Sequence, residues 1–258
     1  MNNILDTILE VKREEISSLT DARNNPDICG PYFNRSTVSF RRALEDSDTG
    51  IIAEFKRKSP SKGWINENAD AVTVVKSYRK AGASAVSILT DSMFFGGSAE
   101  DLILCRSNVS LPVLRKDFII DPLQVYQSKA IGADVILLIA AALTPYKVSE
   151  LASVAHSIGL EVLLEIHNEY ELGHICTDVD VVGVNNRNLS TFQVSLDNSS
   201  GLAHKIPKGY TIISESGISD TATVKNLRKS GYKGFLMGEN FMKTKAPGDA
   251  LAGFIRNL

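Results

Sequence analysis

From residue 50 onward, short apolar runs alternate with longer amphipathic segments. The apolar runs predict strands at 51–56, 85–90, 112–118, 135–143, 161–166, 181–187, 211–217 and 234–238. The segments between and after them have helical spacing and predict helices at roughly 70–82, 98–108, 122–131, 145–158, 168–176, 195–205, 219–230 and 247–257. Strands that alternate with helices of this length are typical of βαβ units and a parallel sheet.

Further features of the sequence bear on how these units are arranged. The run from Val135 to Ile139 is continuously apolar, which indicates a sheet covered on both faces. Glycines at 82, 132 and 159 end helical segments and predict left-handed caps. No Gly-x-Gly-x-x-Gly turn follows the first strand, which argues against a dinucleotide-binding sheet. Eight units in 258 residues therefore predict a single (β/α)8 TIM barrel.

The first 48 residues do not follow this repeat. Apolar side chains recur at helical spacing and predict an amphipathic helix packed on the barrel, at Ile4, Leu5, Ile8, Val11, Ile16 and Leu19. Residues 21–38 are expected to be a connector, and 39–46 a short helix. We therefore expect a helical extension over 1–48 and a catalytic barrel over 49–258.

Composition excludes several classes of protein. The chain is 43% hydrophobic and 22% charged with a net charge of −2, so nucleic acid is not an expected partner. The longest apolar run is too short to span a bilayer, and the charged first 20 residues do not resemble a signal peptide. The three cysteines are far apart and are expected to be reduced. These features predict a cytoplasmic protein that does not associate with membranes.

Charged residues terminate three of the predicted strands. Glu54 and Lys56 end the first, Lys116 the third and Glu165 the fifth. Because side chains alternate along a strand, each shares a face with apolar residues that point into the barrel. The same alternation places further polar residues at the mouth, namely Asn185, Arg187 and Glu215. Active sites of such barrels lie at this end. The alternative is a structural ion-pair network, although buried ion pairs often add little stability.

The loops after the seventh and eighth strands predict a phosphate site. Ser216 and Gly217 follow the seventh strand, and Gly238 and Glu239 follow the eighth. In many barrels these two loops bind phosphate through backbone N–H groups. The alternative is that each glycine only forms its turn.

The basic loop 57–64 directly follows Glu54 and Lys56. It predicts a lid whose cations meet an anionic substrate, or else a solvated surface loop. The histidines lack metal-ligand spacing, and no nucleophile motif is present, so neither a metal nor a cofactor is expected.

Several motifs together resemble the indole-3-glycerol-phosphate synthase family. They are Ile-Ile-Ala-Glu-Phe-Lys-Arg-Lys-Ser-Pro-Ser-Lys-Gly at 51–63, Leu-Thr-Asp at 89–91, Phe-Gly-Gly-Ser at 95–98, Pro-Val-Leu-Arg-Lys-Asp-Phe at 112–118, and the segments 161–165, 183–189 and 214–218. The resemblance extends to the N-terminal helix. It implies a TIM-barrel carboxy-lyase of tryptophan biosynthesis that converts 1-(2-carboxyphenylamino)-1-deoxyribulose 5-phosphate to indole-3-glycerol phosphate, and an association with other enzymes of that pathway is possible.

The resemblance also implies roles for individual residues. Lys116 would be the general acid and Glu165 the base or cation stabiliser. Lys56 would bind the substrate carboxylate, oriented by Glu54. We expected clustered cations to lower the pKa of the lysines. Asn185 would orient the substrate, Arg187 bind an anion and Glu215 support the lysines. The phosphate would be bound by Ser59, Ser216, Gly217, Gly238 and Glu239. The aromatic ring would contact Phe95, Phe118, Leu137 and Leu189.

One position departs from the family pattern, and two other functions are possible for such a barrel. Glu239 stands where some relatives carry a small hydroxyl residue, so we predict that its carboxylate points away from the phosphate. A sugar-phosphate isomerase such as phosphoribosylanthranilate isomerase needs only one acid–base pair and leaves the extension unexplained. A non-catalytic sugar-phosphate-binding barrel would not need a competent residue at every catalytic position.

Overall fold

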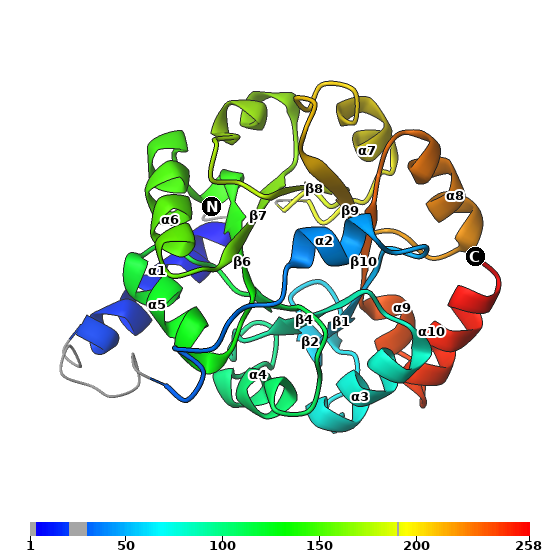
Figure 1. Ribbon diagram of the computed structural model, residues 1–258, viewed down its shortest axis with the longest axis horizontal. Coiled ribbons are helices and arrows are strands. Elements are labelled where there is room, and N and C mark those ends of the chain that lie inside the picture. The colour runs from blue at the N-terminus through cyan, green and yellow to red at the C-terminus, as the bar shows by residue number, and fades with distance from the viewer. Residues whose placement is uncertain (1–3, 21–29, 190) are drawn as a thin grey trace.

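A computed structural model describes residues 4–20, 30–189 and 191–258 of the chain (Figure 1). Within these residues, eight parallel strands form a closed barrel in the order of the chain, with the last strand beside the first. The barrel strands are β1 (Ile51–Phe55), β4 (Ala85–Leu89), β5 (Val113–Lys116), β6 (Val135–Ile139), β7 (Glu161–Ile166), β8 (Val181–Asn185), β9 (Thr211–Glu215) and β10 (Gly234–Met237).

Helices surround the barrel and two precede it. They are α1 (Ile4–Thr20), α2 (Phe40–Glu45), α3 (Ala71–Ala81), α4 (Ala99–Arg106), α5 (Pro122–Ile131), α6 (Pro145–Ser157), α7 (Asp197–Leu202), α8 (Thr221–Lys229), α9 (Glu239–Met242) and α10 (Pro247–Arg256). None of the helices in the described ranges is long and apolar enough to cross a membrane.

All eight predicted strands are confirmed, but most are shorter at their carboxyl ends. Residues 140–142 form the 3-10 helix η2 (Ala140–Ala142) rather than a continuation of the strand, and 168–176 forms the 3-10 helix η3 (Glu169–His174) rather than an α-helix. The sequence did not predict α9 or the small hairpin of β2 (Lys58–Ser59) and β3 (Gly63–Trp64). The expected left-handed glycines are present, with φ of 95° at Gly82, 101° at Gly132 and 75° at Gly159.

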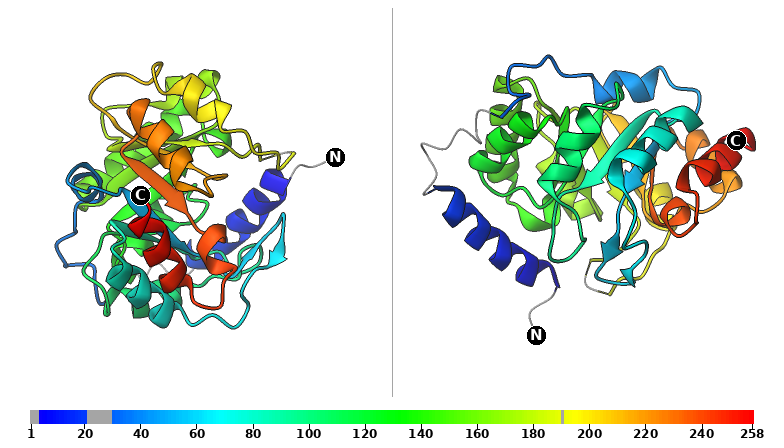
Figure 2. Two further views of the ribbon diagram at one scale, coloured as in Figure 1. Left: turned by 90° about the vertical axis from the view of Figure 1, so that its right-hand side faces the viewer. Right: turned by 90° about the horizontal axis from the view of Figure 1, so that it is seen from below.

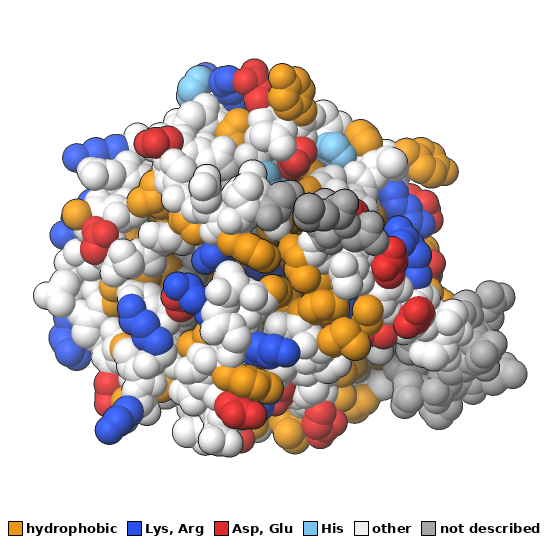
Figure 3. Space-filling model, turned by 180° about the vertical axis from the view of Figure 1, so that it is seen from behind, with side chains coloured by type: hydrophobic (Ala, Val, Ile, Leu, Met, Phe, Trp, Pro, Cys, Tyr) orange, Lys and Arg blue, Asp and Glu red, His pale blue; other side chains and the backbone are white. Residues whose placement is uncertain are grey.

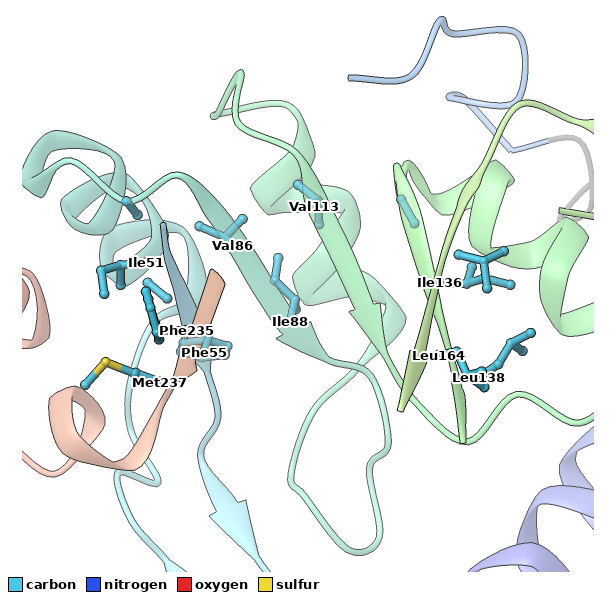
Figure 4. Close-up of a cluster of buried hydrophobic side chains, with 14 of the residues drawn as sticks. Ile51, Phe55, Val86, Ile88, Val113, Ile136, Leu138, Leu164, Phe235 and Met237 are labelled. Carbon is cyan, nitrogen blue, oxygen red and sulfur yellow. The ribbon is translucent and has the colours of Figure 1, made fainter. Parts of the chain in front are cut away.

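The alternation of side chains produces two cores. Outward-facing residues such as Ile51, Phe55 and Val86 pack between strands and helices (Figure 4). Inward-facing residues such as Ile52, Leu114 and Leu163 fill the barrel itself. Because both faces of the sheet are covered, the strands are almost entirely apolar until they reach the mouth.

Helix α2 plugs the amino-terminal end of the barrel. Phe40 and Leu44 are fully buried and join the inward-facing core. The Glu161 carboxylate fixes the helix start by accepting hydrogen bonds from Ser39 Oγ at 2.5 Å and the Arg41 backbone N–H at 2.8 Å. With this end closed, a substrate can enter only from the carboxyl ends of the strands.

Helix α1 lies at the opposite end, together with the β2–β3 hairpin (Figure 2). Its Lys12 is 1% exposed, and Nζ lies 2.9 Å from Asp91 Oδ2 and 3.0 Å from Asp117 Oδ1. These aspartates follow β4 and β5, so the ion pairs fasten α1 to the rim of the barrel. Of the cysteines, Cys105 and Cys176 are free thiols, whereas Cys29 lies outside the described residues.

Candidate active site

A cavity opens at the carboxyl-terminal mouth of the barrel. Hydrophobic and basic side chains gather in the middle of this face, which lies opposite α2 (Figure 3). The cavity is lined by residues from α1, β1 and the loops after β1, β4, β5, β8, β9 and β10. Its lining includes Glu54, Lys56, Ser59, Phe95, Phe118, Asn185, Arg187, Leu189, Ser216, Gly217, Gly238 and Glu239. Twelve positions proposed from sequence therefore meet in one place.

Four proposed positions are not on this lining. Lys116, Glu165 and Glu215 form a buried cluster of charges inside the mouth. Leu137 is 2% exposed and packs in the barrel interior. Its contact with the aromatic ring of a substrate stays a prediction, as do the roles of the three buried charged residues.

Lys116 is the centre of the buried cluster. Its Nζ lies 2.8 Å from Glu165 Oε2 and 3.2 Å from Glu215 Oε2, and both glutamate side chains are 2% exposed. Burial alone would lower the pKa of Lys116, but the charges of Glu165, Glu215 and Glu54 outweigh it and raise that pKa. Our expectation of a lowered lysine pKa was wrong, because carboxylates rather than other cations surround the ammonium group.

Glu165 and Glu215 titrate in opposite directions. Burial would raise the pKa of Glu165, but Lys116 and His167 hold it well below its usual range. Burial raises the pKa of Glu215 to about 8, a rise that Lys116 opposes and Glu165 reinforces. The Glu215 Oε1 atom accepts no hydrogen bond from the described residues. The cluster thus holds one ionised carboxylate and one that binds a proton near neutral pH.

Two glycines leave room for the carboxylates of Glu215 and Glu54. A Cβ at Gly183 would lie 2.3 Å from Glu215 Oε1, and a Cβ at Gly238 would lie 2.6 Å from Glu54 Oε1. Glu54 in turn pairs with Lys56 at 2.7 Å. We had attributed Gly238 to close approach of a phosphate, but its contact with Glu54 is an additional reason for glycine at this position.

The loop after β9 has an unusual backbone. Ser216 and Gly217 have φ of 67° and 78°, and a non-glycine residue in this region is uncommon. Such outliers often occur at ligand sites. Ser59 Oγ also lines the cavity and has no hydrogen-bond partner among the described residues. These groups border the cavity together with Gly238 and Glu239, where the sequence predicted phosphate binding.

The basic loop has a different role from the one expected for Arg57. Its guanidinium binds both Asp101 carboxylate oxygens, at 2.6 and 2.9 Å, and the carbonyls of Ala69 and Gly96. Arg57 therefore fastens the loop to α4 and does not face a substrate. Ser59, Pro60 and Ser61 do line the cavity.

The apolar part of the cavity has contributors that the sequence did not reveal. Phe95 and Phe118 lie with ring centroids 6.1 Å apart. The apolar stripe of α1 adds Ile4, Leu5 and Ile8. The stripe predicted a helix packed on the barrel, but not that it would cover the site.

Two polar residues were also missed. Lys12 shares its helix with many solvated charges, and the lone His167 has no motif spacing, so no sequence signal distinguished either one. His167 lies 3.3 Å from Glu165. No cluster of three or more histidine, cysteine or carboxylate residues within the described ranges is arranged to hold a metal ion.

Comparisons with known proteins agree with this geometry. The family model described as indole-3-glycerol phosphate synthase matches residues 5–254. The chain is 51% identical over 259 residues to an indole-3-glycerol phosphate synthase of Bacteroides thetaiotaomicron, with all of both chains covered. It is 41% identical to that of Bordetella pertussis, covering 99% of this chain and 100% of that one.

Solved structures support the fold alone. The tryptophan synthase subunit alpha of Legionella pneumophila matches with a TM-score of 0.62 and 15% identity over 86% of this chain and all of that one. KGPDC from Streptococcus mutans matches with a TM-score of 0.62 and 13% identity over 80% of this chain and 95% of that one. On its sequence, barrel and mouth, the chain belongs to the indole-3-glycerol phosphate synthase family, decarboxylating lyases of tryptophan biosynthesis.

Proposed function

We propose that Lys116 and Glu165 catalyse the ring closure of 1-(2-carboxyphenylamino)-1-deoxyribulose 5-phosphate in this enzyme. The observation that carries the proposal is the contact of the Lys116 ammonium with two buried carboxylates at the mouth. Attack of the aryl carbon on the ketone creates negative charge on the carbonyl oxygen. A protonated lysine stabilises that oxygen and donates a proton to it, while a fixed carboxylate stabilises the cationic ring that forms.

The raised pKa of Lys116 is compatible with this role. A developing alkoxide is strongly basic, so the lysine can protonate it without having a lowered pKa of its own. The same surroundings keep Lys116 charged before the substrate binds. Loss of CO2 then restores the aromatic ring.

The dehydration step needs a second acid and base. Lys56 and Glu54 form a separate pair at 2.7 Å, and both line the cavity. We assign them to this step, with Lys56 also binding the substrate carboxylate. Glu215 would support Lys116, since its raised pKa allows it to exchange a proton near neutral pH.

The remaining lining would bind the ends of the substrate. Asn185 and Arg187 project from the end of β8 into the cavity. The phosphate would be bound by Ser59 Oγ and backbone N–H groups of the two loops, at Ser216, Gly217, Gly238 and Glu239. Phe95, Phe118 and Leu189 would contact the aromatic ring.

The cellular location, the partners and the domain division of the enzyme are also proposals. We place the enzyme in the cytoplasm and keep association with other tryptophan-pathway enzymes as a proposal. The division into an extension over 1–48 and a catalytic barrel over 49–258 is likewise proposed, with α1 contributing to the cavity.

The test follows indole fluorescence during turnover of synthetic substrate. We expect wild type to form indole-3-glycerol phosphate and Lys116→Ala to lose about 10²–10⁴-fold in kcat while still binding substrate. Lys147→Ala is the matched control, because among the described residues Lys147 pairs with Glu150 alone, on the surface of α6. Binding without product in wild type, or a Lys116→Ala enzyme as active as the control, would refute the proposal.

A further inference from the structure

His167 connects the proposed base to a second carboxylate outside the barrel. It follows β7, and its side chain is 11% exposed. Nε2 lies 3.3 Å from Glu165 Oε1, and Nδ1 lies 3.3 Å from Glu171 Oε2 on η3. The ring is therefore held between two carboxylates.

The outer carboxylate is itself fixed. Glu171 Oε2 accepts a hydrogen bond from the His167 backbone N–H at 2.7 Å, and Oε1 accepts one from Asn168 Nδ2 at 2.7 Å. Glu171 thus cannot turn away from the imidazole without losing both bonds. The loop after β7 is built so that a carboxylate faces each ring nitrogen.

The charges around this group come from four elements. Glu165 faces it from β7 and Glu171 from η3, while Lys116 of β5 and Glu215 of β9 contact Glu165 from the other side. Burial would lower the pKa of His167, but its two carboxylate neighbours raise it to about 10. Both oxygens of Glu165 consequently face a cation, Oε2 facing Lys116 and Oε1 facing His167.

We propose that His167 is a positioning residue: as an imidazolium, it keeps Glu165 ionised and directed at Lys116 throughout the reaction. The inference rests on the proposed role of Glu165. When Lys116 transfers its proton to the substrate oxygen, it loses its charge, and Glu165 loses the attraction of its nearest cation. A second cation that takes no part in the transfer keeps the carboxylate ionised while Lys116 is neutral.

The first test compares the pH dependence of kcat/KM for wild type, His167→Gln and His174→Gln. Loss of a cation beside a carboxylate raises the carboxylate pKa by about 1 unit or more. We expect the acidic limb of His167→Gln to move up by about one pH unit, so that activity on that limb falls about tenfold and recovers at higher pH. His174 is the matched control because its ring nitrogens lie within hydrogen-bond distance of the backbone carbonyls of Leu143 and Glu171 and of no carboxylate in the described part of the chain.

Other outcomes would overturn the proposal. A loss in His167→Gln that is equal at every pH indicates only a structural role for the loop. An unchanged profile shows that Glu165 does not depend on this cation. Equal shifts in both glutamine variants would also contradict it, since His174 does not face Glu165.

A second measurement is independent of turnover. Imidazole ¹⁵N chemical shifts, assigned with His167→Gln, report the charge of His167 in the intact enzyme. We expect an imidazolium through pH 8 in wild type and titration at lower pH in Glu165→Gln. A neutral ring at pH 7 in wild type would refute the inference even if the enzyme is active. Full activity of Glu165→Gln with a charged ring would instead refute the role of Glu165 in the proposed function.

Discussion

Two lysines at the same end of the barrel each lie between two buried acids, yet the two clusters differ. Lys12 contacts Asp91 and Asp117 outside the barrel, and Lys116 contacts Glu165 and Glu215 inside it. Asp117 also accepts hydrogen bonds from Thr90 at 2.5 Å and from the Phe118 backbone at 2.8 Å. In the inner cluster, Glu215 Oε1 accepts none from the described residues. Asp117 thus has more hydrogen-bond partners than Glu215.

The titration of the acids reflects this difference. Burial would raise the pKa of Asp117, but Arg115 and Lys12 lower it to about 2. Glu215, which contacts one shared lysine and lies near a second carboxylate, has a pKa of about 8. Asp117, which faces two cations and accepts two further hydrogen bonds, therefore stays ionised, whereas Glu215, which faces one lysine, binds a proton more readily.

The difference between the two clusters is tested most strongly by removing Lys12 and measuring the free energy of unfolding. Lys12→Met leaves two buried carboxylates without their shared cation, so we expect the free energy of unfolding to fall by about 3–5 kcal/mol. Urea denaturation measures the change. Lys116→Met is the counterpart, and it should cost less because Glu215 can remain protonated. Equal losses in the two variants would show that the clusters do not differ as described.

A smaller effect is expected from filling the space beside Glu215. A Cβ at Gly183 would lie 2.3 Å from Glu215 Oε1, so Gly183→Ala should displace the carboxylate and destabilise the fold by about 1–3 kcal/mol. We also expect a lower kcat, since Lys116 loses part of its support. Gly173→Ala is the control, because a Cβ there meets no atom within 4 Å. Equal stability and activity in both variants would contradict the prediction.

The two clusters should also differ in how their contribution to the free energy of unfolding changes with pH. Glu215 has a raised pKa in the folded state, so its contribution is fully present below about pH 4.5 and is lost as pH rises to about 8. In Glu215→Gln the side chain cannot ionise, so this loss of stability with rising pH should be absent. We expect the variant to gain at least about 1 kcal/mol over wild type between pH 5 and 8.5 in thermal or chemical denaturation. A difference that does not change with pH would refute the assignment.

Asp117 has the opposite sign. Its pKa is lowered to about 2, so its contribution is present above about pH 4 and is lost as pH falls towards 2. The same denaturation series for Asp117→Asn should therefore approach wild type only in strong acid. Convergence at neutral pH would show that Asp117 is not ionised in the fold.

The smallest effect is expected at the edge of the mouth. Glu239 is half-buried at the start of α9 and borders the cavity. If only its backbone faces the phosphate, Glu239→Ser should leave KM within about twofold of wild type, the equivalent of about 0.4 kcal/mol. A much lower KM in the variant would mean that the carboxylate repels the phosphate.

The alternation of side chains explains how much of this site was predictable. Glu54 and Lys56, Lys116 and Glu165 follow apolar residues of the same strand face, so the barrel geometry alone brings them to the mouth. The same rule places Leu137 on the inward face of β6, but it does not give the depth of a residue along the barrel axis.

Long-range pairing was not predictable. Arg57 belongs to a basic loop of the kind that binds anionic substrates. Its ion pair with Asp101 depends on the position of α4, which the sequence does not give. Nothing local distinguishes Lys12 from its solvated neighbours, since its partners follow β4 and β5. A pKa direction also depends on which charges surround a group, which explains why we expected the wrong sign for Lys116.

The fastening of α1 has a consequence for synthesis of the chain. Helix α1 is translated before the barrel, but the aspartates that bind Lys12 follow the second and third barrel strands. At about 5–20 residues per second, Asp117 is translated about 5–20 s after Lys12. During this interval the charged lysine and the apolar stripe of α1 have no docking surface. Docking of α1, which completes the lining of the cavity, therefore has to wait until the second and third barrel strands have been made.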